Sequence, residues 1–195
     1  MSRSERQLTF LYLSDKLKSV TRQNRLHDGS RDENAAEHSW HLTLMALLFA
    51  EHAPPGTDLT HVTRLLIVHD LVEVYAGDTM IFNDADAVGV LERERVAAER
   101  LFSTLPEDQN REFSALWHEF EARDTEEARF AKALDAFHPP LMTWGKGGVG
   151  SSHHELTAAL AREHKRPYLE AYPALWTILC QALDEAVAVG TLRAN

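Results

Sequence analysis

The apolar residues of this chain recur at helical spacing in nearly every segment, and this pattern constrains the fold more than any other feature. Side chains that recur every three or four positions line one face of an α-helix. Only 9 glycines and 7 prolines interrupt the 195 residues, and no segment reads convincingly as a strand. We therefore expect an all-α fold of seven or eight helices. The expected helices cover approximately 5–20, 34–52, 60–77, 87–104, 106–122, 125–137, 152–164 and 173–189.

The breaks between these helices follow from residues that end a helix. Gly77 is expected to close the third helix, and Pro139-Pro140 to stop the helix that begins near residue 125. Ser152–Glu155 matches a capping box that starts the next helix. The segments that we expect to be connectors or loops are Thr21–Asp32, Phe82–Asp86 and Gly145–Gly150. Residues 1–195 are expected to form a single domain, with a core region at about 20–140 and C-terminal helices at 152–190 packing on it.

The charge balance narrows the classes of partner. Lys and Arg total 20 and Asp and Glu total 30, which gives a formal net charge of −10. A protein that binds nucleic acid or an anionic membrane presents a basic face, so we expect neither partner. The apolar stretches are far shorter than the roughly 20 residues that span a bilayer, and no secretory signal opens the chain. The single cysteine, Cys180, cannot form an internal disulfide, and we expect a cytoplasmic protein.

One expected helix carries charged residues where its pattern is apolar. His69 and Asp70 come directly after Leu65–Val68, and an ionised carboxylate in such surroundings is costly unless it is paired or binds a metal. Glu73 lies on the same helical face, and Asp78 follows just beyond the end of the helix. Three acids and a histidine therefore gather at one helical end.

Two further polar residues interrupt apolar faces. His38 continues the apolar face of the helix over 34–52, and Asp135 lies on the apolar face of the helix over 125–137. Taken alone, a buried histidine is usually a hydrogen-bonded core residue, and a lone aspartate near a helix end is usually a cap or a surface charge. Combined with His69 and Asp70, they offer nitrogen and oxygen ligands for a divalent cation such as Mn, Co, Fe, Ni or Zn. Four ligands on an octahedral ion leave positions for water and substrate, as catalysis requires.

Three short motifs stand in a fixed order along the chain. Glu33–Ser39 reads E-N-A-A-E-H-S, His69–Asp78 reads H-D-L-V-E-V-Y-A-G-D, and Ala131–Asp135 reads A-K-A-L-D. His69-Asp70 lies 31 positions after His38, and Asp135 a further 65 positions on. This H…HD…D pattern resembles the HD-domain superfamily of metal-dependent phosphohydrolases, and the local words resemble its 5′-deoxynucleotidase-like branch. The resemblance covers about residues 8–145.

The resemblance implies an HD-domain helical bundle with one divalent metal per chain. The metal ligands that it implies are His38, His69, Asp70 and Asp135. The catalytic residues that it implies, on the substrate side, are Glu73 and Asp78. The branch has an arginine followed closely by a tryptophan upstream of the first histidine, whereas this chain has Arg22–Arg25 and no tryptophan there. Arg22 is therefore carried over as the phosphate contact, with Arg25 or Arg31 as an alternative, and the base and sugar preference stays open.

Members of this branch hydrolyse deoxynucleoside 5′-monophosphates, typically as homodimers. The resemblance thus implies a phosphohydrolase that cleaves the phosphomonoester of a (deoxy)nucleoside 5′-monophosphate or a related small phosphate. Glu73 would exchange a proton with the attacking water or the leaving oxygen, and Arg22 would neutralise phosphoryl charge. Lys132 either pairs with a site carboxylate or is a solvated helical lysine. The alternatives are a cyclic-nucleotide or alarmone phosphodiesterase, a dinuclear iron oxygenase, and a metal-stabilised ligand-binding protein without turnover.

A few other residues receive structural interpretations. Trp40 and His41 beside the first expected ligand are interpreted as core or supporting packing. His138, which precedes the two prolines, is interpreted as a cap of the helix that carries Asp135. Trp144 and the loop Gly145–Gly150 are a candidate lid, because glycine-rich loops move at low cost.

Overall fold

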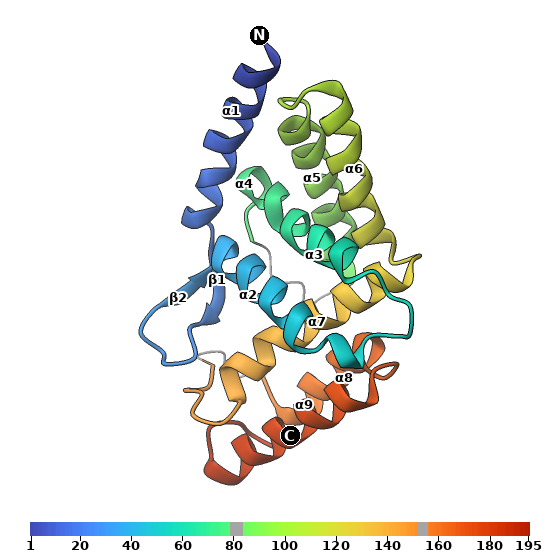
Figure 1. Ribbon diagram of the computed structural model, residues 1–195. Helices are drawn as coiled ribbons and strands as arrows, with labels where there is room; N and C mark the ends of the chain where they lie inside the picture. The colour runs from blue at the N-terminus through green and yellow to red at the C-terminus, as the bar shows by residue number, and fades with distance from the viewer. Residues whose placement is uncertain (79–83, 152–155) are drawn as a thin grey trace.

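The computed structural model describes residues 1–78, 84–151 and 156–195, which form helices almost throughout (Figure 1). Eight helices of ten or more residues and one single-turn helix, α4, are present in these ranges, so the all-α prediction is confirmed. Short 3-10 segments cover Asp15–Ser19, Ala50–His52 and His69–Val72. The α-helices are α1 Arg3–Ser14, α2 Ala35–Leu48, α3 Leu59–Val68, α4 Glu73–Ala76, α5 Asp84–Phe102, α6 Glu107–Ala122, α7 Glu126–Trp144, α8 Ala158–Leu169 and α9 Pro173–Val189.

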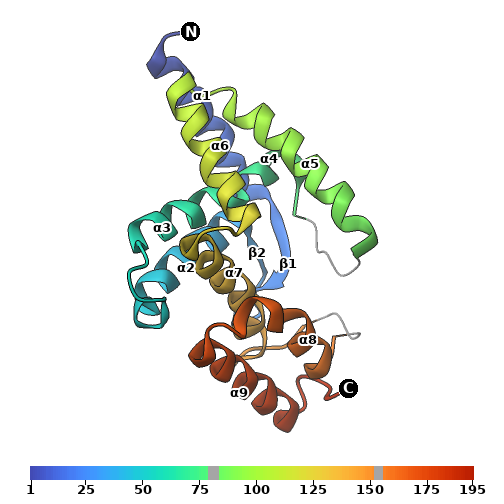
Figure 2. The same cartoon turned by 90° about the vertical axis from the view of Figure 1, so that its right-hand side faces the viewer.

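Helices α2, α3 and α7 pack on one another in the middle of the molecule. Helices α1, α5 and α6 lie toward one end, and α8 and α9 pack against α7 at the other, so the two termini lie at opposite ends (Figures 1 and 2). Leu42, Leu65 and Leu134, one from each central helix, are fully buried. Removing such leucines from water contributes roughly 1.5–3 kcal/mol each. The central layer therefore holds the helices that carry the unusual polar residues.

The connector expected over 21–32 contains a small antiparallel hairpin instead. β1 covers Thr21–Arg25 and β2 covers Asp32–Asn34, with Thr21 opposite Asn34. A turn closes it: Gly29 has a φ of 70°, which favours glycine, and its N–H donates to the carbonyl of Leu26 at 2.8 Å. The expectation of no strands is wrong here, because these short polar strands lack the apolar alternation that predicts a strand.

Helix α7 continues through Pro139 and Pro140 to Trp144, so the expected stop at the prolines is also wrong. Each proline lacks an N–H, which leaves the carbonyls of Asp135 and Ala136 without their helical donor. Packing of α7 against α2, α3, α8 and α9 holds the segment in place. Beyond the prolines the helical hydrogen bonding continues to the end of α7, where the N–H of Gly145 donates to the carbonyl of Leu141 at 2.8 Å. Tertiary packing therefore outweighs the local signal.

The helix expected over 60–77 is divided at the polar residues. α3 ends at Val68, a 3-10 turn carries His69–Val72, and the single-turn helix α4 follows. Gly77, with a φ of 73°, ends this segment as expected. Because 3-10 winding is tighter than α winding, the turn changes the directions in which His69 and Asp70 point.

Helix α2 is less buried than its sequence suggested. Trp40, Leu47 and Leu48 are 65%, 62% and 65% exposed, so the expectation of a helix buried nearly all round, and of core packing for Trp40, is wrong. An exposed apolar side chain is common on protein surfaces, and sequence alone does not mark which face is covered.

The remaining boundaries differ in smaller ways. The expected loop over 82–86 lies partly outside the described residues, and its residues from Asp84 onward already belong to α5. The capping box expected at 152–155 lies outside the described residues, and α8 is capped by Thr157, whose hydroxyl accepts from the N–H of Leu160. Within the described ranges no helix is long and apolar enough to cross a membrane.

Candidate functional site

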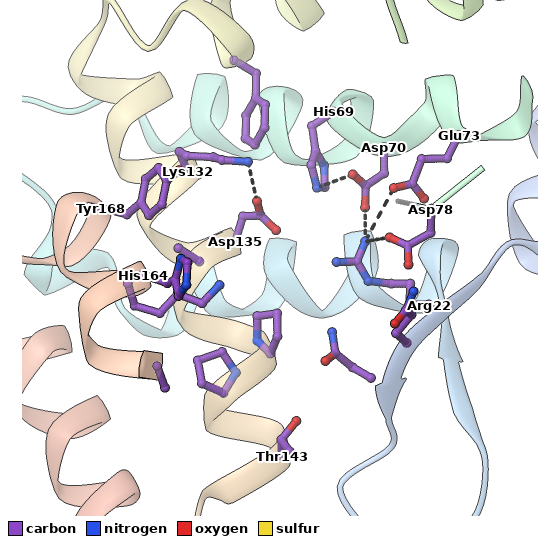
Figure 3. A pocket seen from close by; sticks show the side chains of 18 of the residues that line it. Arg22, His69, Asp70, Glu73, Asp78, Lys132, Asp135, Thr143, His164 and Tyr168 are labelled. Atoms are coloured by element: carbon purple, nitrogen blue, oxygen red, sulfur yellow. Dashed lines mark hydrogen bonds and ion pairs between the residues drawn. The ribbon is translucent and has the colours of Figure 1, made fainter. Parts of the chain in front are cut away.

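A cavity of about 380 Å³ opens between β1, the 3-10 turn after α3, α7 and α8 (Figure 3). Figure 3 shows Arg22 of β1 beside Asp70 on one side and His164 and Tyr168 of α8 on the opposite side, with Asp135 between them. Cavities of about 300–1,000 Å³ are typical of sites for small ligands. The polar residues singled out in the sequence therefore gather in a space of suitable size.

Three of the four expected metal ligands converge on one point. One ligand atom each from His38, His69 and Asp135 lies within 4.8 Å of the other two. Asp70 lies beside them, with Oδ1 3.0 Å from Nε2 of His69 and Oδ2 4.0 Å from Nε2 of His38. The structure therefore brings together all four residues from α2, the 3-10 turn and α7.

The orientation of His69 fits a metal ligand. Its Nδ1 lies 2.8 Å from the carbonyl of Leu66, which can only accept, so Nδ1 carries the hydrogen. In the neutral ring Nε2 then presents a lone pair, and within the described part of the chain this atom is buried without a hydrogen-bond partner, although the Asp70 carboxylate is close. A lone pair and a carboxylate oxygen facing each other at this distance require a proton or a metal ion between them. Imidazole and carboxylate ligands suit a divalent transition metal.

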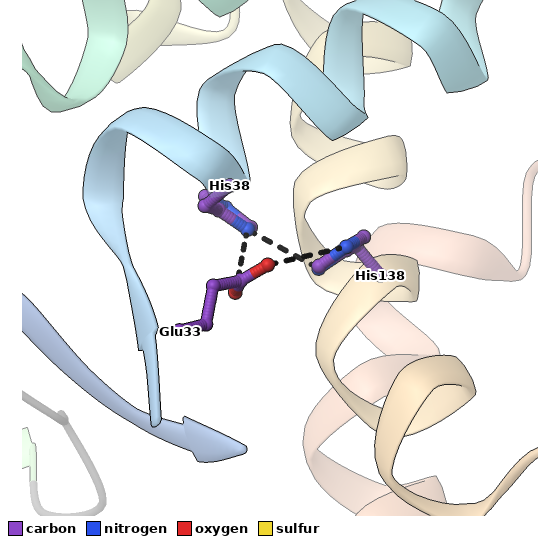
Figure 4. Close-up of side chains that lie close together, drawn as sticks. All are labelled: Glu33, His38 and His138. Atoms are coloured by element: carbon purple, nitrogen blue, oxygen red, sulfur yellow. Dashed lines mark hydrogen bonds and ion pairs between the residues drawn. The ribbon is translucent and has the colours of Figure 1, made fainter. Parts of the chain in front are cut away.

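Behind the cavity, Glu33 and His138 hold the ring of His38 (Figure 4). Nδ1 of His38 lies 3.2 Å from Nδ1 of His138 and 3.5 Å from Oε2 of Glu33, whereas Nε2 faces Asp135 at 3.0 Å. Nε2 of His138 lies 2.9 Å from Nδ1 of His41. Burial, with the charges of His38 and His41, lowers the pKa of His138 well below its usual value, so its ring is neutral. These contacts orient the ring of His38 with Nε2 toward the cavity.

The sequence interpretation expected a supporting position for His41 but missed Glu33 and His138. His138 lies inside α7, so its interpretation as a helix cap is wrong. Its position three residues after Asp135 was a usable signal, because such residues share a helix face. Glu33 stands in the first motif but received no role of its own. Both are buried, and this depends on packing between segments about 100 positions apart.

Arg22 lies in the site among four carboxylates. Its guanidinium is 2.9 Å from Asp70 and 3.8 Å from each of Glu33, Glu73 and Asp78. Burial opposes the low pKa of Asp70, but the adjacent His69 ring and the charge of Arg22 keep the pKa of Asp70 well below its ordinary value. The carboxylate is therefore ionised and available as a ligand.

Arg25 does not reach this site. It is exposed at the far end of β1, and its Nε lies 3.7 Å from Asp32 of the paired strand. Burial alternates along β1, where Arg22 and Asn24 are half-buried and Arg25 is exposed. Arg22, Gln23 and Asn24 line the cavity, whereas Arg25 does not. Arg31 is not in the cavity wall either, and its guanidinium donates to Glu37 at 2.8 Å. Of the three arginines considered for phosphate, the structure brings only Arg22 to the cavity.

Glu73 and Asp78 both line the cavity. Burial and the charge of Asp70 raise the pKa of Glu73 to about 10, so this carboxyl holds a proton at neutral pH. Its Oε2 is buried without a partner among the described residues. Burial also raises the pKa of Asp78, against the effect of Arg22. Glu73 thus holds a proton beside the expected metal ligands.

Helices α5 and α7 contribute two more charged groups. Nζ of Lys132 lies 2.9 Å from Oδ2 of Asp135, so this lysine pairs with a site carboxylate. Glu94, which the sequence analysis did not single out, also lines the cavity, and burial together with the charge of Glu121 raises its pKa to about 7. Trp144, part of the expected lid, lies at the end of α7 in the cavity wall.

Comparisons with known proteins identify the family of this chain. The HD domain family model matches residues 14–176. The 5′-deoxynucleotidase HDDC2 of Bos taurus is 32% identical over 129 residues, which are 66% of this chain and 62% of that protein, and its Homo sapiens counterpart is 30% identical over the same length. The match thus spans less than two thirds of these relatives.

A solved structure covers almost the whole chain. The crystal structure of a predicted metal-dependent phosphohydrolase from Magnetospirillum magnetotacticum MS-1 is 44% identical, with a TM-score of 0.88 over 99% of this chain and 100% of that one. The family model and this likeness both extend over α2, the 3-10 turn after α3, and α7, which carry the converging polar residues. The chain belongs to the HD domain family.

Proposed function

We propose that this protein is a metal-dependent phosphohydrolase that cleaves the phosphomonoester of a (deoxy)nucleoside 5′-monophosphate or a related small phosphate. The observation that carries the proposal is the buried Nε2 of His69, which has no hydrogen-bond partner in the described chain and lies within a group of histidine and aspartate side chains. Arg22 and a protonated Glu73 lie beside this group. The names of the relatives, 5′-deoxynucleotidase and metal-dependent phosphohydrolase, support the same reaction class.

In this proposal His38, His69, Asp70 and Asp135 hold one divalent ion. The chemistry that such an ion supplies is Lewis acidity toward water and phosphoryl oxygens. Nothing in the donor set conflicts with that role, because two imidazoles and two carboxylates are ligands that Mn, Co, Fe, Ni and Zn accept. Mn and Co are therefore the first two ions to add in an assay.

Other cavity residues transfer protons, neutralise phosphoryl charge and position a metal ligand. Glu73 holds a proton at neutral pH and donates it to the leaving 5′ oxygen, with Asp78 as the second candidate for proton exchange. Arg22 neutralises charge on the phosphoryl oxygens as it spreads in the transition state. Lys132 holds Asp135 in place through its 2.9 Å contact. A nucleoside would occupy the rest of the cavity, whose wall includes Pro139 and other apolar residues.

The test is phosphate release from a panel of deoxynucleoside and ribonucleoside 5′-monophosphates, with Mn or Co added. Asp70→Asn should lose metal and activity together. Glu73→Gln should keep the metal and lose turnover by roughly 100-fold or more, the usual scale of general acid–base catalysis. Glu107→Gln, at an exposed position of α6, is the matched control and should leave turnover unchanged. Full activity after exhaustive chelation would refute the proposal.

We also propose that the protein is a homodimer, as the family resemblance implies. Trp40, Leu47 and Leu48 form an exposed apolar stripe on α2, and covering such a stripe removes apolar surface from water. Light scattering coupled to size-exclusion chromatography should give twice the chain mass of 22.0 kDa. Leu47→Glu should shift the protein toward the monomer. A wild-type protein that elutes as a monomer at all concentrations would contradict this.

A further inference from the structure

Lys165 is a cation in the cavity wall that has no partner among the described residues. It lies on α8 and lines the cavity together with residues of the 3-10 turn and α7. Two other cations of the wall are paired, Arg22 with Asp70 at 2.9 Å and Lys132 with Asp135 at 2.9 Å. Across residues 1–78, 84–151 and 156–195, no hydrogen bond or ion pair holds the ammonium group of Lys165.

The charges around Lys165 leave its ammonium group incompletely compensated. Burial lowers the pKa of Lys165, and the charge of Asp135 offsets this only in part, because Lys132 and Arg22 repel the ammonium. Asp135 is already shared by His38 and Lys132. Lys165 is half-buried in the cavity wall, and an ammonium group that has no protein partner there can pair with a charged ligand. The missing partner is therefore an anion that enters the cavity.

The placement of α8 indicates which anion. Arg22 approaches the expected metal ligands from β1, and the α8 residues His164 and Tyr168 lie across the cavity from it (Figure 3). A phosphate bound at the metal ligands would thus lie between Arg22 and α8. A phosphomonoester has three terminal oxygens and carries up to two negative charges, whereas a phosphodiester has two terminal oxygens and one charge. Arg22 on one side and Lys165 on the other, in addition to the expected metal ligands, would match the extra terminal oxygen and the extra charge of the monoester.

We propose that Lys165 binds a terminal phosphate oxygen of the substrate from the α8 side and thereby selects phosphomonoesters over phosphodiesters. This inference rests on the proposed phosphohydrolase function. It adds a phosphate-binding residue outside the three motifs of the family resemblance, and it separates the proposed activity from cleavage of cyclic nucleotides.

The experiment compares Lys165→Met, Lys165→Arg and the control Lys16→Met, which removes an exposed lysine after α1. The first readout is the thermal midpoint with and without inorganic phosphate, in the presence of Mn. A ligand that binds the folded state raises the midpoint, so phosphate should stabilise the wild type and Lys16→Met equally and Lys165→Met much less. Without phosphate, Lys165→Met should be at least as stable as the wild type.

The second readout is kcat/KM for p-nitrophenyl phosphate and for bis(p-nitrophenyl) phosphate, which share a leaving group. Lys165→Met should lower kcat/KM for the monoester by about 10- to 100-fold, the scale of one charged hydrogen bond, and change the diester value by less than about twofold. Lys165→Arg, which keeps the charge, should recover part of the monoester activity.

The outcomes separate the two proposals. An unchanged phosphate stabilisation or monoester rate in Lys165→Met, or equal losses for the two esters, would overturn the role of Lys165. Phosphate that stabilises neither the wild type nor the variants would overturn it as well. A wild type that hydrolyses no phosphate ester, while phosphate binding still depends on Lys165, would refute the proposed function and leave the anion site standing.

Discussion

Replacing Arg22 by methionine removes the cation that four carboxyl groups surround. The side chain of Arg22 is 11% exposed, and its guanidinium lies 2.9 Å from Asp70 and 3.8 Å from Asp78. Methionine keeps much of the apolar stem but offers neither the charge nor the hydrogen-bond donors. The carboxylates would then face one another in the metal-free protein.

The expected cost follows from these distances. With an effective dielectric constant of about 20, attraction between unit charges is about 6 kcal/mol at the Asp70 separation and about 4 kcal/mol at the Asp78 separation. The desolvation of Arg22 offsets part of this gain. Removing one partner of a buried pair typically costs about 3–5 kcal/mol, and we expect a loss of this size in the free energy of unfolding.

The assay is urea unfolding of the metal-free protein, compared with Arg3→Met. Arg3 contacts Asp108 at 2.8 Å, a distance similar to that between Arg22 and Asp70. The side chains of Arg3 and Asp108 are, however, both more than half exposed. Solvent screening makes such surface pairs weak, so Arg3→Met should change the midpoint little. Adding Mn should restore part of the stability of Arg22→Met, because a bound cation compensates the same carboxylates.

Equal losses in the two variants would refute this reasoning. They would mean that burial does not strengthen the Arg22 contacts, or that the carboxylates take up protons at no cost. A double-mutant cycle with Asp70→Asn measures the direct interaction, which should be larger than that of Arg3 with Asp108→Asn.

Three further predictions concern other parts of the molecule. The raised pKa of Glu94, about 7, means that the metal-free folded state holds a proton which the unfolded chain releases above about pH 4.5, so stability falls as the pH rises between these values. Glu94→Gln should therefore stabilise the protein at pH 8, by about 1 kcal/mol after solvent screening, and not at pH 4; equal effects at both values would contradict this. Phe137→Ala, at a fully buried position, should cost about 3–5 kcal/mol in urea unfolding, and a loss below about 1 kcal/mol would show that the site is not packed as described. His138→Phe should weaken metal affinity about 10- to 100-fold by calorimetry, because His38 loses its support, and unchanged affinity would remove that role.

Local sequence signals predicted most of the helices. The last helix was expected at 173–189 and covers Pro173–Val189, and Gly77 ends its segment as expected. Spacing of apolar side chains and helix-ending residues act over a few positions, so they can be interpreted without knowing the fold. The same local reasoning singled out His38, His69, Asp70 and Asp135, because each is a polar residue on an apolar face.

Contacts between distant segments decided the rest. The pairing of β1 with β2, the passage of α7 through its prolines and the support of His38 by His138 all depend on partners that no local pattern reveals. The direction of a side chain on a strand selected Arg22 over Arg25, and the packing of α8 on α7 brought Lys165 into the cavity. Sequence by itself determined most of the helical segments and which residues are chemically unusual. Only the tertiary structure decided which of those residues meet, because burial and charge pairing are properties of packed segments.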